Sequence, residues 1–207
     1  MKSSFNFTLN HYNQTIQKYK DAGYSFDGID FKSHNKSIIM IHDVDHEISL
    51  CNKFLKEEVE LNIRSTYFLR LHAKKYNMLS DDSICMARKI LDSGCDIGLH
   101  YEPAFCPTDS YNQHIRREMN ILSEAIGTQI KYFNLHEPAR TGFDLTNVAP
   151  EINRCPQSEY YKDYKYISDS SCNWREGCFS EHINKWDSIL VLTHPLWWYD
   201  KRPSENY

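Results

Sequence analysis

The sequence lacks several features that would place it in other protein classes. No run of apolar residues approaches the roughly 20 needed to cross a bilayer, and the first residues contain no hydrophobic segment typical of a secretory signal. No block of Lys and Arg stands out and the net charge is -4, which argues against a groove for a nucleic-acid backbone. Seven cysteines include no Cys-x-x-Cys pair, which favours reduced thiols. These absences predict a cytoplasmic protein without a membrane span or a nucleic-acid partner.

What the chain does contain is sufficient for one domain with a substantial core. It has 207 residues, of which 41% are hydrophobic and 14% aromatic. We find no linker and no internal repeat. We therefore expect a single domain over residues 1–207, in which residues 1–36 form an N-terminal helix and a lead-in.

Strands and helices are predicted to alternate about every thirty residues. A helix is expected over 8–23 and a polar connection over 24–36. The predicted strands are 37–41, 65–71, 95–100, 130–135, 164–167 and 188–192, and the predicted helices between them are 48–61, 81–94 and 109–127. Residues 141–161 are expected to form a long loop or a short helix. This alternation is typical of βα units and a parallel sheet.

Polar side chains follow five of these strands at the points where the strands end. They form five clusters: His42 with Asp43 and Asp45, His100 with Glu102, His136 with Arg140, Asp169, and His194. Because parallel strands point the same way, their carboxyl ends share one face, where ligand and catalytic groups collect. A single His or Asp at such a position is often only a satisfied polar residue. Five clusters together predict a functional site.

The residue types in these clusters indicate metal-assisted hydrolysis. Three or four His and Asp ligands around an open coordination position make a Lewis acid that also lowers the pKa of bound water. A carboxylate that is not on the metal can accept a proton from that water, and a His on the other side can protonate the leaving group.

The motifs and their spacing, from about residue 37 to 195, resemble the polysaccharide deacetylase (NodB-homology, carbohydrate esterase 4) superfamily. The divergent branch that carries His-Asp-Val-Asp, which includes proteins associated with O-antigen gene clusters, is the most similar. The matching segments are Ile41-His42-Asp43-Val44-Asp45, Ser65-Thr66-Tyr67-Phe68-Leu69, Asp96-Ile97-Gly98-Leu99-His100, His136-Glu137-Pro138, Ser168 to Trp174, and Leu192-Thr193-His194.

The resemblance implies a distorted (β/α) barrel that holds one divalent metal ion, most commonly zinc, and removes acetyl groups from N-acetylated sugars. It implies that Asp43 is the catalytic base and His194 the general acid. It also implies that Asp45 and His100 bind the metal. The family's second metal-binding His would fall on Ala104. We expect His136 to replace it, with Glu102 as the alternative.

Further residues near the predicted strand ends are candidates for substrate binding: Glu102, Arg140, Asp169, Trp174 and Trp197. The leading hypothesis is a metal-dependent N-deacetylase that acts on a sugar or glycan precursor in surface polysaccharide biosynthesis. One alternative is a catalytically inactive, sugar-binding homologue. Another is a phosphoesterase on an α/β barrel, which would favour two metals and more basic groups, of which only Arg140 is well placed.

Overall fold

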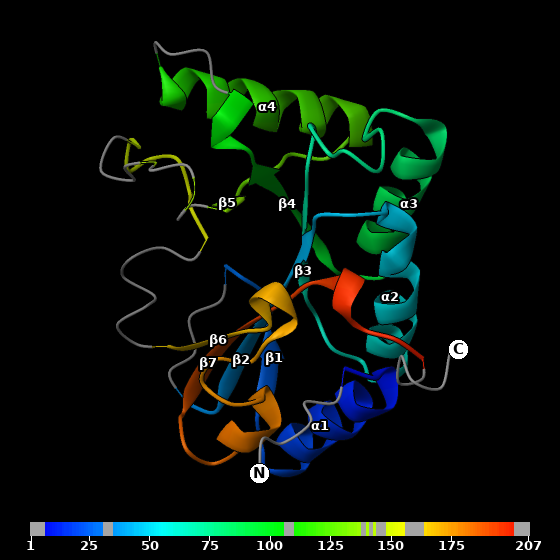
Figure 1. Ribbon diagram of the computed structural model, residues 1–207, viewed down its shortest axis with the longest axis vertical. Coiled ribbons are helices and arrows are strands. Elements are labelled where there is room, and N and C mark those ends of the chain that lie inside the picture. Colours follow the sequence, from blue (N-terminus) through cyan, green and yellow to red (C-terminus); the bar gives the residue numbers. More distant parts are fainter. Residues whose placement is uncertain are drawn as a thin grey trace.

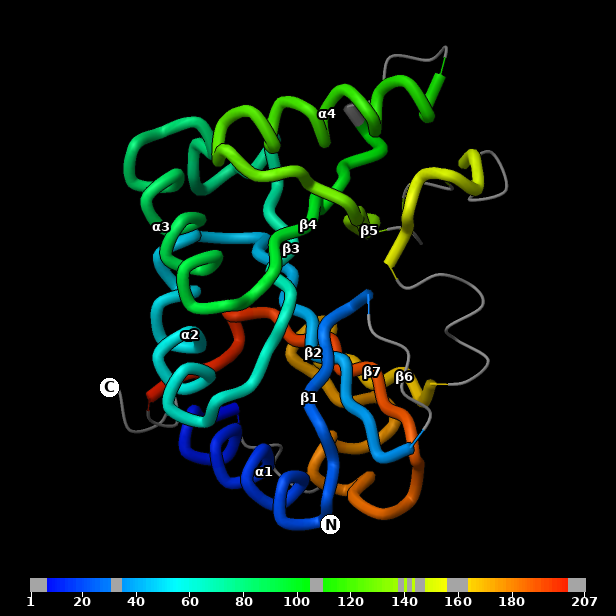
Figure 2. Tube along the Cα trace, turned by 180° about the vertical axis from the view of Figure 1, so that it is seen from behind, coloured from blue at the N-terminus to red at the C-terminus, as the bar shows by residue number. Residues whose placement is uncertain are grey.

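The computed structural model describes residues 7–30, 35–105, 110–137, 140, 143, 148–155 and 164–200. These residues form a sheet of seven parallel strands: β1 Ser25–Asp27, β2 Ser37–Val44, β3 Thr66–Leu69, β4 Asp96–Tyr101, β5 Phe133–Leu135, β6 Lys165–Ser168 and β7 Ser188–Thr193. Their order across the sheet is β5-β4-β3-β2-β7-β6, and β1 pairs with β2. The sheet curls into a half-barrel, as Figures 1 and 2 show from opposite sides.

Strand β2 is the centre of this sheet, and all eight of its residues are buried. It pairs with β7 from Ser37↔Ser188 to His42↔Thr193. Its carboxyl end also pairs with β3, and its amino end pairs with β1. Because every pairing is parallel, the carboxyl ends of β2, β4, β5 and β7 open at the same rim.

Helices cover the outer side of the half-barrel (Figure 1): α1 Leu9–Asp21, α2 Cys51–Glu60, α3 Asp81–Asp92 and α4 Tyr111–Ile126. The side-chain oxygens of Thr8, Ser80 and Ser110 accept hydrogen bonds from backbone N–H groups in the first turns of α1, α3 and α4. Gly127, with a φ of 73°, ends α4 in the left-handed conformation that glycine adopts without strain. None of the described helices is long and apolar enough to cross a membrane.

The strand residues separate into an outer and an inner core. Ile38 and Met40 pack with the helices, whereas Ile39 and Ile41 belong to a smaller cluster on the inner side. This alternation is the two-residue period of a β-strand. Phe68 fills the inner side next to Gly98, where a Cβ would lie 2.3 Å from the Phe68 ring. Glycine is required there because the ring occupies the space that a side chain would need.

The helices and strands predicted from the sequence are confirmed, with small shifts at their ends. The helix expected over 48–61 starts with a short 3-10 turn, Ile48–Leu50, and continues as α2. The interpretation of 24–36 as only a polar connection was wrong, because β1 lies within it. That strand has three residues, none of them buried, so it leaves no hydrophobic pattern in the sequence. Most of the loop expected over 141–161 falls outside the described residues.

Candidate functional site

The alternation along β2 decides which polar residues enter the half-barrel. Side chains two residues apart on a strand lie on the same face. Asp43 follows Ile39 and Ile41 at this spacing and therefore points inward. His42 points outward, where its Nε2 lies 2.7 Å from Glu58 Oε1. The sequence cluster His42, Asp43 and Asp45 is thus divided by the strand, and His42 is not part of the inner site.

The rim of the half-barrel holds a pocket of about 790 Å³. Its lining includes seven of the residues singled out from the sequence: Asp43, Asp45, His100, His136, Arg140, His194 and Trp197. These residues are contributed by the ends of β2, β4, β5 and β7 and by the segments that follow β5 and β7. The structure therefore brings together the predicted base, acid and metal ligands in one cavity.

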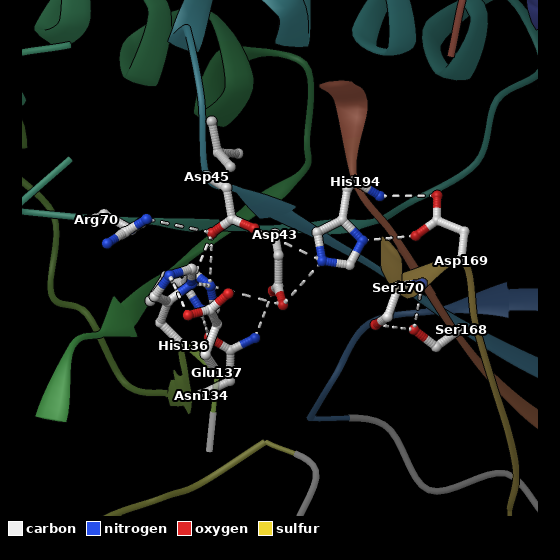
Figure 3. A network of polar contacts seen from close by, with 12 residues as sticks. Asp43, Asp45, Arg70, Asn134, His136, Glu137, Ser168, Asp169, Ser170 and His194 are labelled. Carbon is white, nitrogen blue, oxygen red and sulfur yellow. Dashed lines mark hydrogen bonds and ion pairs between the residues drawn. The ribbon is translucent and has the colours of Figure 1, made fainter. Parts of the chain in front are cut away.

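Asp45, His100 and His136 place three ligand atoms next to one another, and Figure 3 shows Asp45 and His136 of this triad. Asp45 Oδ1 lies 3.0 Å from His100 Nε2 and 2.9 Å from His136 Nδ1. The two imidazole nitrogens are 3.1 Å apart. Glu102, the alternative third ligand, instead binds Arg70 at 2.6 Å and lies 3.6 Å from His136 Nε2, on the other side of that ring.

This donor set fits one divalent cation. Asp45 Oδ1 is buried and, within the described part of the chain, has no hydrogen-bond partner of acceptable geometry, although two imidazole nitrogens lie within 3.0 Å of it. Burial would raise the pKa of Asp45, but His100 and His136 hold it well below its usual range, so the carboxylate is ionised. One carboxylate and two imidazoles beside an open pocket match the protein ligands of catalytic zinc sites in number and type.

Asn134 connects the metal ligands to Asp43. Its Oδ1 lies 2.5 Å from His100 Nδ1, so this nitrogen is the donor and carries the proton. In the neutral imidazole, which is the form that ligates a metal, His100 Nε2 then carries the lone pair, on the side of Asp45 and His136. The Nδ2 of Asn134 donates to Asp43 Oδ1 at 2.5 Å. A single amide thereby orients both a candidate metal ligand and the candidate base.

His194 is held by a buried carboxylate on the opposite side of the pocket (Figure 3). Its Nδ1 donates to Asp169 Oδ1 at 2.6 Å, and its backbone N–H donates to Asp169 Oδ2 at 3.0 Å. The indole N–H of Trp198 also donates to Asp169 Oδ2, at 2.8 Å. Burial would lower the pKa of His194, but the charge and hydrogen bond of Asp169, with smaller contributions from Asp43 and Asp45, raise it to about 9. His194 is therefore protonated at neutral pH.

Asp43 lies between the ligand triad and His194. Its Oδ2 is 3.8 Å from His100 Nε2 and 4.0 Å from His194 Nε2. Because Asn134 binds the other oxygen, Oδ2 is the one that faces the pocket. A carboxylate and a protonated imidazole thus flank the same candidate metal-ligating triad.

The five candidates for substrate binding have different locations. Arg140 and Trp197 line the pocket. Asp169 is fully buried behind His194, and Glu102 is buried against Arg70. Trp174 is 2% exposed and packs on Phe7 and Phe179, away from the pocket lining. The structure therefore places Asp169 against His194 and Glu102 against Arg70 and His136, and it does not bring Trp174 to the site.

Three other residues of the site were not predicted from the sequence. For Asn134 the only available signal is its spacing: it precedes His136 by two residues, so both side chains leave β5 in the same direction. Arg154 and Arg175 line the pocket but come from segments without a predicted strand end.

No family model and no curated protein matches the sequence. Among solved structures, a CE4 family pseudoenzyme from Bacillus anthracis matches at 12% identity and a TM-score of 0.50, over 78% of this chain and 55% of that chain. A mutant of that pseudoenzyme with restored enzymatic activity matches at 12% identity and a TM-score of 0.50, over 57% of its length. A family 4 acetyl xylan esterase from Clostridium thermocellum, in complex with a cobalt ion, has 15% identity and a TM-score of 0.47, over 80% of this chain and 76% of that chain.

The chain has the polysaccharide deacetylase fold. The (β/α) barrel architecture implied by the resemblance is therefore confirmed, in the form of a curled half-barrel. The chain spans a little over half the length of the two pseudoenzyme structures that it matches. At this level of identity the likeness establishes the fold alone, and the activity has to be argued from the pocket.

Proposed function

We propose that this chain is a metal-dependent hydrolase that removes the acetyl group from an N-acetylated sugar or glycan precursor. One observation carries the proposal. Asp43 Oδ2 and His194 Nε2 lie 4.0 Å apart. Asp43 Oδ2 is also 3.8 Å from His100 Nε2, and His194 Nε2 is 3.7 Å from Asp45 Oδ2, so both contact the triad of Asp45, His100 and His136 that offers the ligating atoms. Base, acid and ligand triad thus meet at one pocket.

Asp45, His100 and His136 would hold one divalent cation, for which zinc is the best match to two imidazoles and a carboxylate. When bound, that cation lowers the pKa of water and polarises the acetyl carbonyl. Asp43 accepts the proton from the attacking water through Oδ2. Asn134 fixes the Asp43 carboxylate in this orientation.

His194 supports the second half of the reaction. Amide hydrolysis requires protonation of the departing amine, because an amide anion is a very poor leaving group. The proton on Nδ1 is bound by Asp169, and the proton on Nε2 is directed toward the pocket. With a pKa raised to about 9, His194 is in the acidic form before the reaction begins.

The second candidate function is a catalytically inactive, sugar-binding homologue. A structural neighbour at a TM-score of 0.50 is described as a pseudoenzyme, which is the observation that favours it. Against it, this chain retains both the triad and the acid–base pair in contact with one another. A two-metal phosphoesterase has less support, because the described residues contain a single group of metal-ligating side chains.

The proposal is tested by acetate release from N-acetylglucosamine and its oligomers, measured together with metal content. Chelator-treated protein should be inactive, and one equivalent of Zn²⁺ should restore acetate release. His100→Ala should lose both metal and activity. His11→Ala removes an imidazole from α1 on the outer side and should lose neither. Wild-type metal content in His100→Ala would disprove the ligand set. A metal-loaded wild type that binds these sugars without releasing acetate would favour the inactive homologue.

A further inference from the structure

Four neighbouring strands of the sheet are followed by side chains that contact one another in a ring. The strands lie in the order β5-β4-β3-β2, and the residues directly after them are His136, Glu102, Arg70 and Asp45. Arg70 contacts both carboxylates of this set, and His136 contacts the same two carboxylates from the other side. Asp45 and His136 are candidate metal ligands, so the ring includes two residues, Arg70 and Glu102, whose role the proposed chemistry leaves open.

Arg70 uses the two terminal nitrogens of its guanidinium for different carboxylates. Nη2 donates to Glu102 Oε2 at 2.6 Å, and Nη1 lies 3.6 Å from Asp45 Oδ1, a contact that Figure 3 shows. The Arg70 and Glu102 side chains are only 7% and 9% exposed, so water screens this ion pair weakly. A planar fork can contact both carboxylates at once, whereas the single ammonium of a lysine cannot occupy both positions.

The backbone of Arg70 is tied to the end of β2. Its N–H donates to the hydroxyl of Tyr76 at 2.8 Å, and that hydroxyl donates to the carbonyl of Val44 at 3.1 Å. Val44 is the last residue of β2 and directly precedes Asp45. The Tyr76 hydroxyl therefore links the end of β3 to the end of β2 and keeps Arg70 beside Asp45.

Glu102 faces the nitrogen of His136 that is turned away from Asp45. His136 Nδ1 lies 2.9 Å from Asp45 Oδ1, and Nε2 lies 3.6 Å from Glu102 Oε2, which is an electrostatic contact and not a hydrogen bond. A half-turn of the imidazole about its Cβ–Cγ bond would exchange each nitrogen with a carbon. The charge of Glu102 therefore favours the ring orientation that presents Nδ1 to the candidate metal centre.

A second carboxylate near His136 Nε2 has a weaker influence. Glu137 Oε2 lies 4.0 Å from this nitrogen, but the Glu137 side chain is 45% exposed. Both of its oxygens also accept hydrogen bonds from Arg140, at 2.9 and 3.1 Å. Water and Arg140 thus compensate the charge of Glu137, while Glu102 acts from a buried position.

We infer that Arg70 is a positioning residue of the candidate metal centre: it holds the Glu102 carboxylate behind His136, so that His136 Nδ1, and not Glu102, is the third ligand atom. The inference rests on the proposed function for the presence of a divalent cation. When Nδ1 ligates a metal, the ring proton is on Nε2 and faces Glu102. A carboxylate behind a ligating imidazole fixes the orientation of the ring and raises its basicity.

Metal binding by substituted proteins tests this role. Glu102→Gln keeps the size of the side chain but removes its charge, and Arg70→Lys keeps the charge but removes the fork. Each should lower Zn²⁺ affinity about 10- to 100-fold, measured by competition with a chromophoric chelator. Each should also change the visible absorption of Co²⁺-loaded protein, which depends on the ligands and their geometry. The double variant should lose no more affinity than the more affected single variant, because the two residues act through one contact.

Two matched controls should leave both metal readouts unchanged. Arg64→Lys alters another arginine that pairs with two carboxylates, those of Asp30 and Asp96, away from the pocket lining. Glu137→Gln removes the other carboxylate near His136 Nε2. The inference is overturned by wild-type affinity in Glu102→Gln, by an equal loss in Glu137→Gln, or by a double variant whose loss equals the product of the single losses. Glu102→Gln decides the matter even if Arg70→Lys does not fold.

These readouts require no substrate, so they separate this inference from the proposed function. If the variants lose Zn²⁺ affinity as expected but Zn²⁺-loaded wild type releases no acetate, the positioning role stands and the deacetylase proposal fails. If wild type releases acetate while Glu102→Gln and Arg70→Lys bind Zn²⁺ as tightly as wild type, the deacetylase proposal stands and the inference is wrong. A wild type that binds neither Zn²⁺ nor Co²⁺ would disprove both.

Discussion

Two carboxylate centres lie on opposite faces of β2 and are built from similar residue types. We call the outer one the closed centre (Tyr12, His42, Glu58, Ser65 and Tyr67) and the inner one the open centre (Asp43, Asp45, His100, His136 and His194). In the closed centre Glu58 Oε1 accepts from Tyr12 and His42, and Oε2 accepts from Ser65 and Tyr67, all at 2.7 to 2.8 Å. Both Glu58 and His42 are fully buried.

The open centre differs in the hydrogen bonding of its carboxylate oxygens. Asp45 Oδ1 is buried next to two imidazoles without a well-directed donor from the described residues, and Asp43 Oδ2 faces the pocket. A His–carboxylate pair is therefore not by itself a sign of function. Complete pairing and full burial indicate a structural role, whereas unshared lone pairs that converge on a cavity indicate a binding or catalytic role.

The largest expected effect is on catalysis in the open centre. Asp43→Asn and His194→Ala should each lower turnover by about 10²- to 10⁴-fold, the usual contribution of a general base or acid. Both variants should keep their metal, because neither residue belongs to the ligand triad. Acetate release, metal content and melting temperature are measured together. Normal turnover of either variant would eliminate that residue from the mechanism, and loss of stability alone would assign it to packing.

The same isosteric change in the closed centre should reduce stability instead. Glu58→Gln removes the charge that pairs with buried His42, and the free energy of unfolding should fall by about 3 to 5 kcal/mol. Turnover per folded molecule should not change. Glu60→Gln, at an exposed position of the same helix, is the matched control. A Glu58→Gln variant that is as stable as wild type but inactive would reverse the assignment of the two centres.

The stability contributed by Glu58 also has a defined pH dependence. Burial would raise the pKa of Glu58, but the charge and hydrogen bond of His42, together with Tyr67 and Ser65, lower it below its ordinary value of 4.5. A carboxylate with a depressed pKa stabilises the fold fully above its unfolded-state pKa and loses this contribution as the pH falls through the folded-state pKa. Denaturant unfolding at neutral pH and below pH 4.5 should show this loss in wild type and less of it in Glu58→Gln.

Most of the open centre can be predicted from the sequence because its residues lie at the ends of predicted strands. Asp45, His100 and His194 directly follow or terminate strands with clear hydrophobic patterns, so their convergence follows from parallel topology. The sequence does not reveal Asn134, whose role depends on a hydrogen bond with His100 of β4 and another with Asp43 of β2, which exist only once the sheet is assembled. Arg154 and Arg175 depend on how the segments beyond the end strands return to the pocket. The grouping of His42 with Asp43 failed because adjacent strand residues face opposite sides.

A variant at Asp169 tests whether this carboxylate controls the protonation of His194 in the open centre. Asp169→Asn removes the largest of the charges that raise the pKa of His194 to about 9, so the pKa should fall, although Asp43 and Asp45 still oppose the effect of burial. The pKa is measured by NMR titration of the imidazole in metal-free protein, in wild type and variant. An unchanged His194 pKa in Asp169→Asn would show that Asp169 does not control its protonation.

The smallest expected effect concerns Asn134, which joins two parts of the open centre. Asn134→Ala removes the acceptor for His100 Nδ1–H and the donor to Asp43, and metal affinity should fall about 10- to 100-fold, as for other outer residues that orient a ligating imidazole. Zn²⁺ affinity is measured by competition with a chromophoric chelator, and turnover is measured at saturating Zn²⁺.

Asn134→Asp separates the two hydrogen bonds. The new carboxylate still accepts from His100, and a carboxylate behind a ligating imidazole strengthens its basicity, so Zn²⁺ affinity should be retained. Toward Asp43, however, a donor has been replaced by a second negative charge 2.5 Å away, which favours protonation of one of the two carboxyl groups. Turnover at neutral pH should therefore fall while metal binding persists. If Asn134→Asp and Asn134→Ala lose metal affinity equally, the amide acts by packing and not by orienting His100.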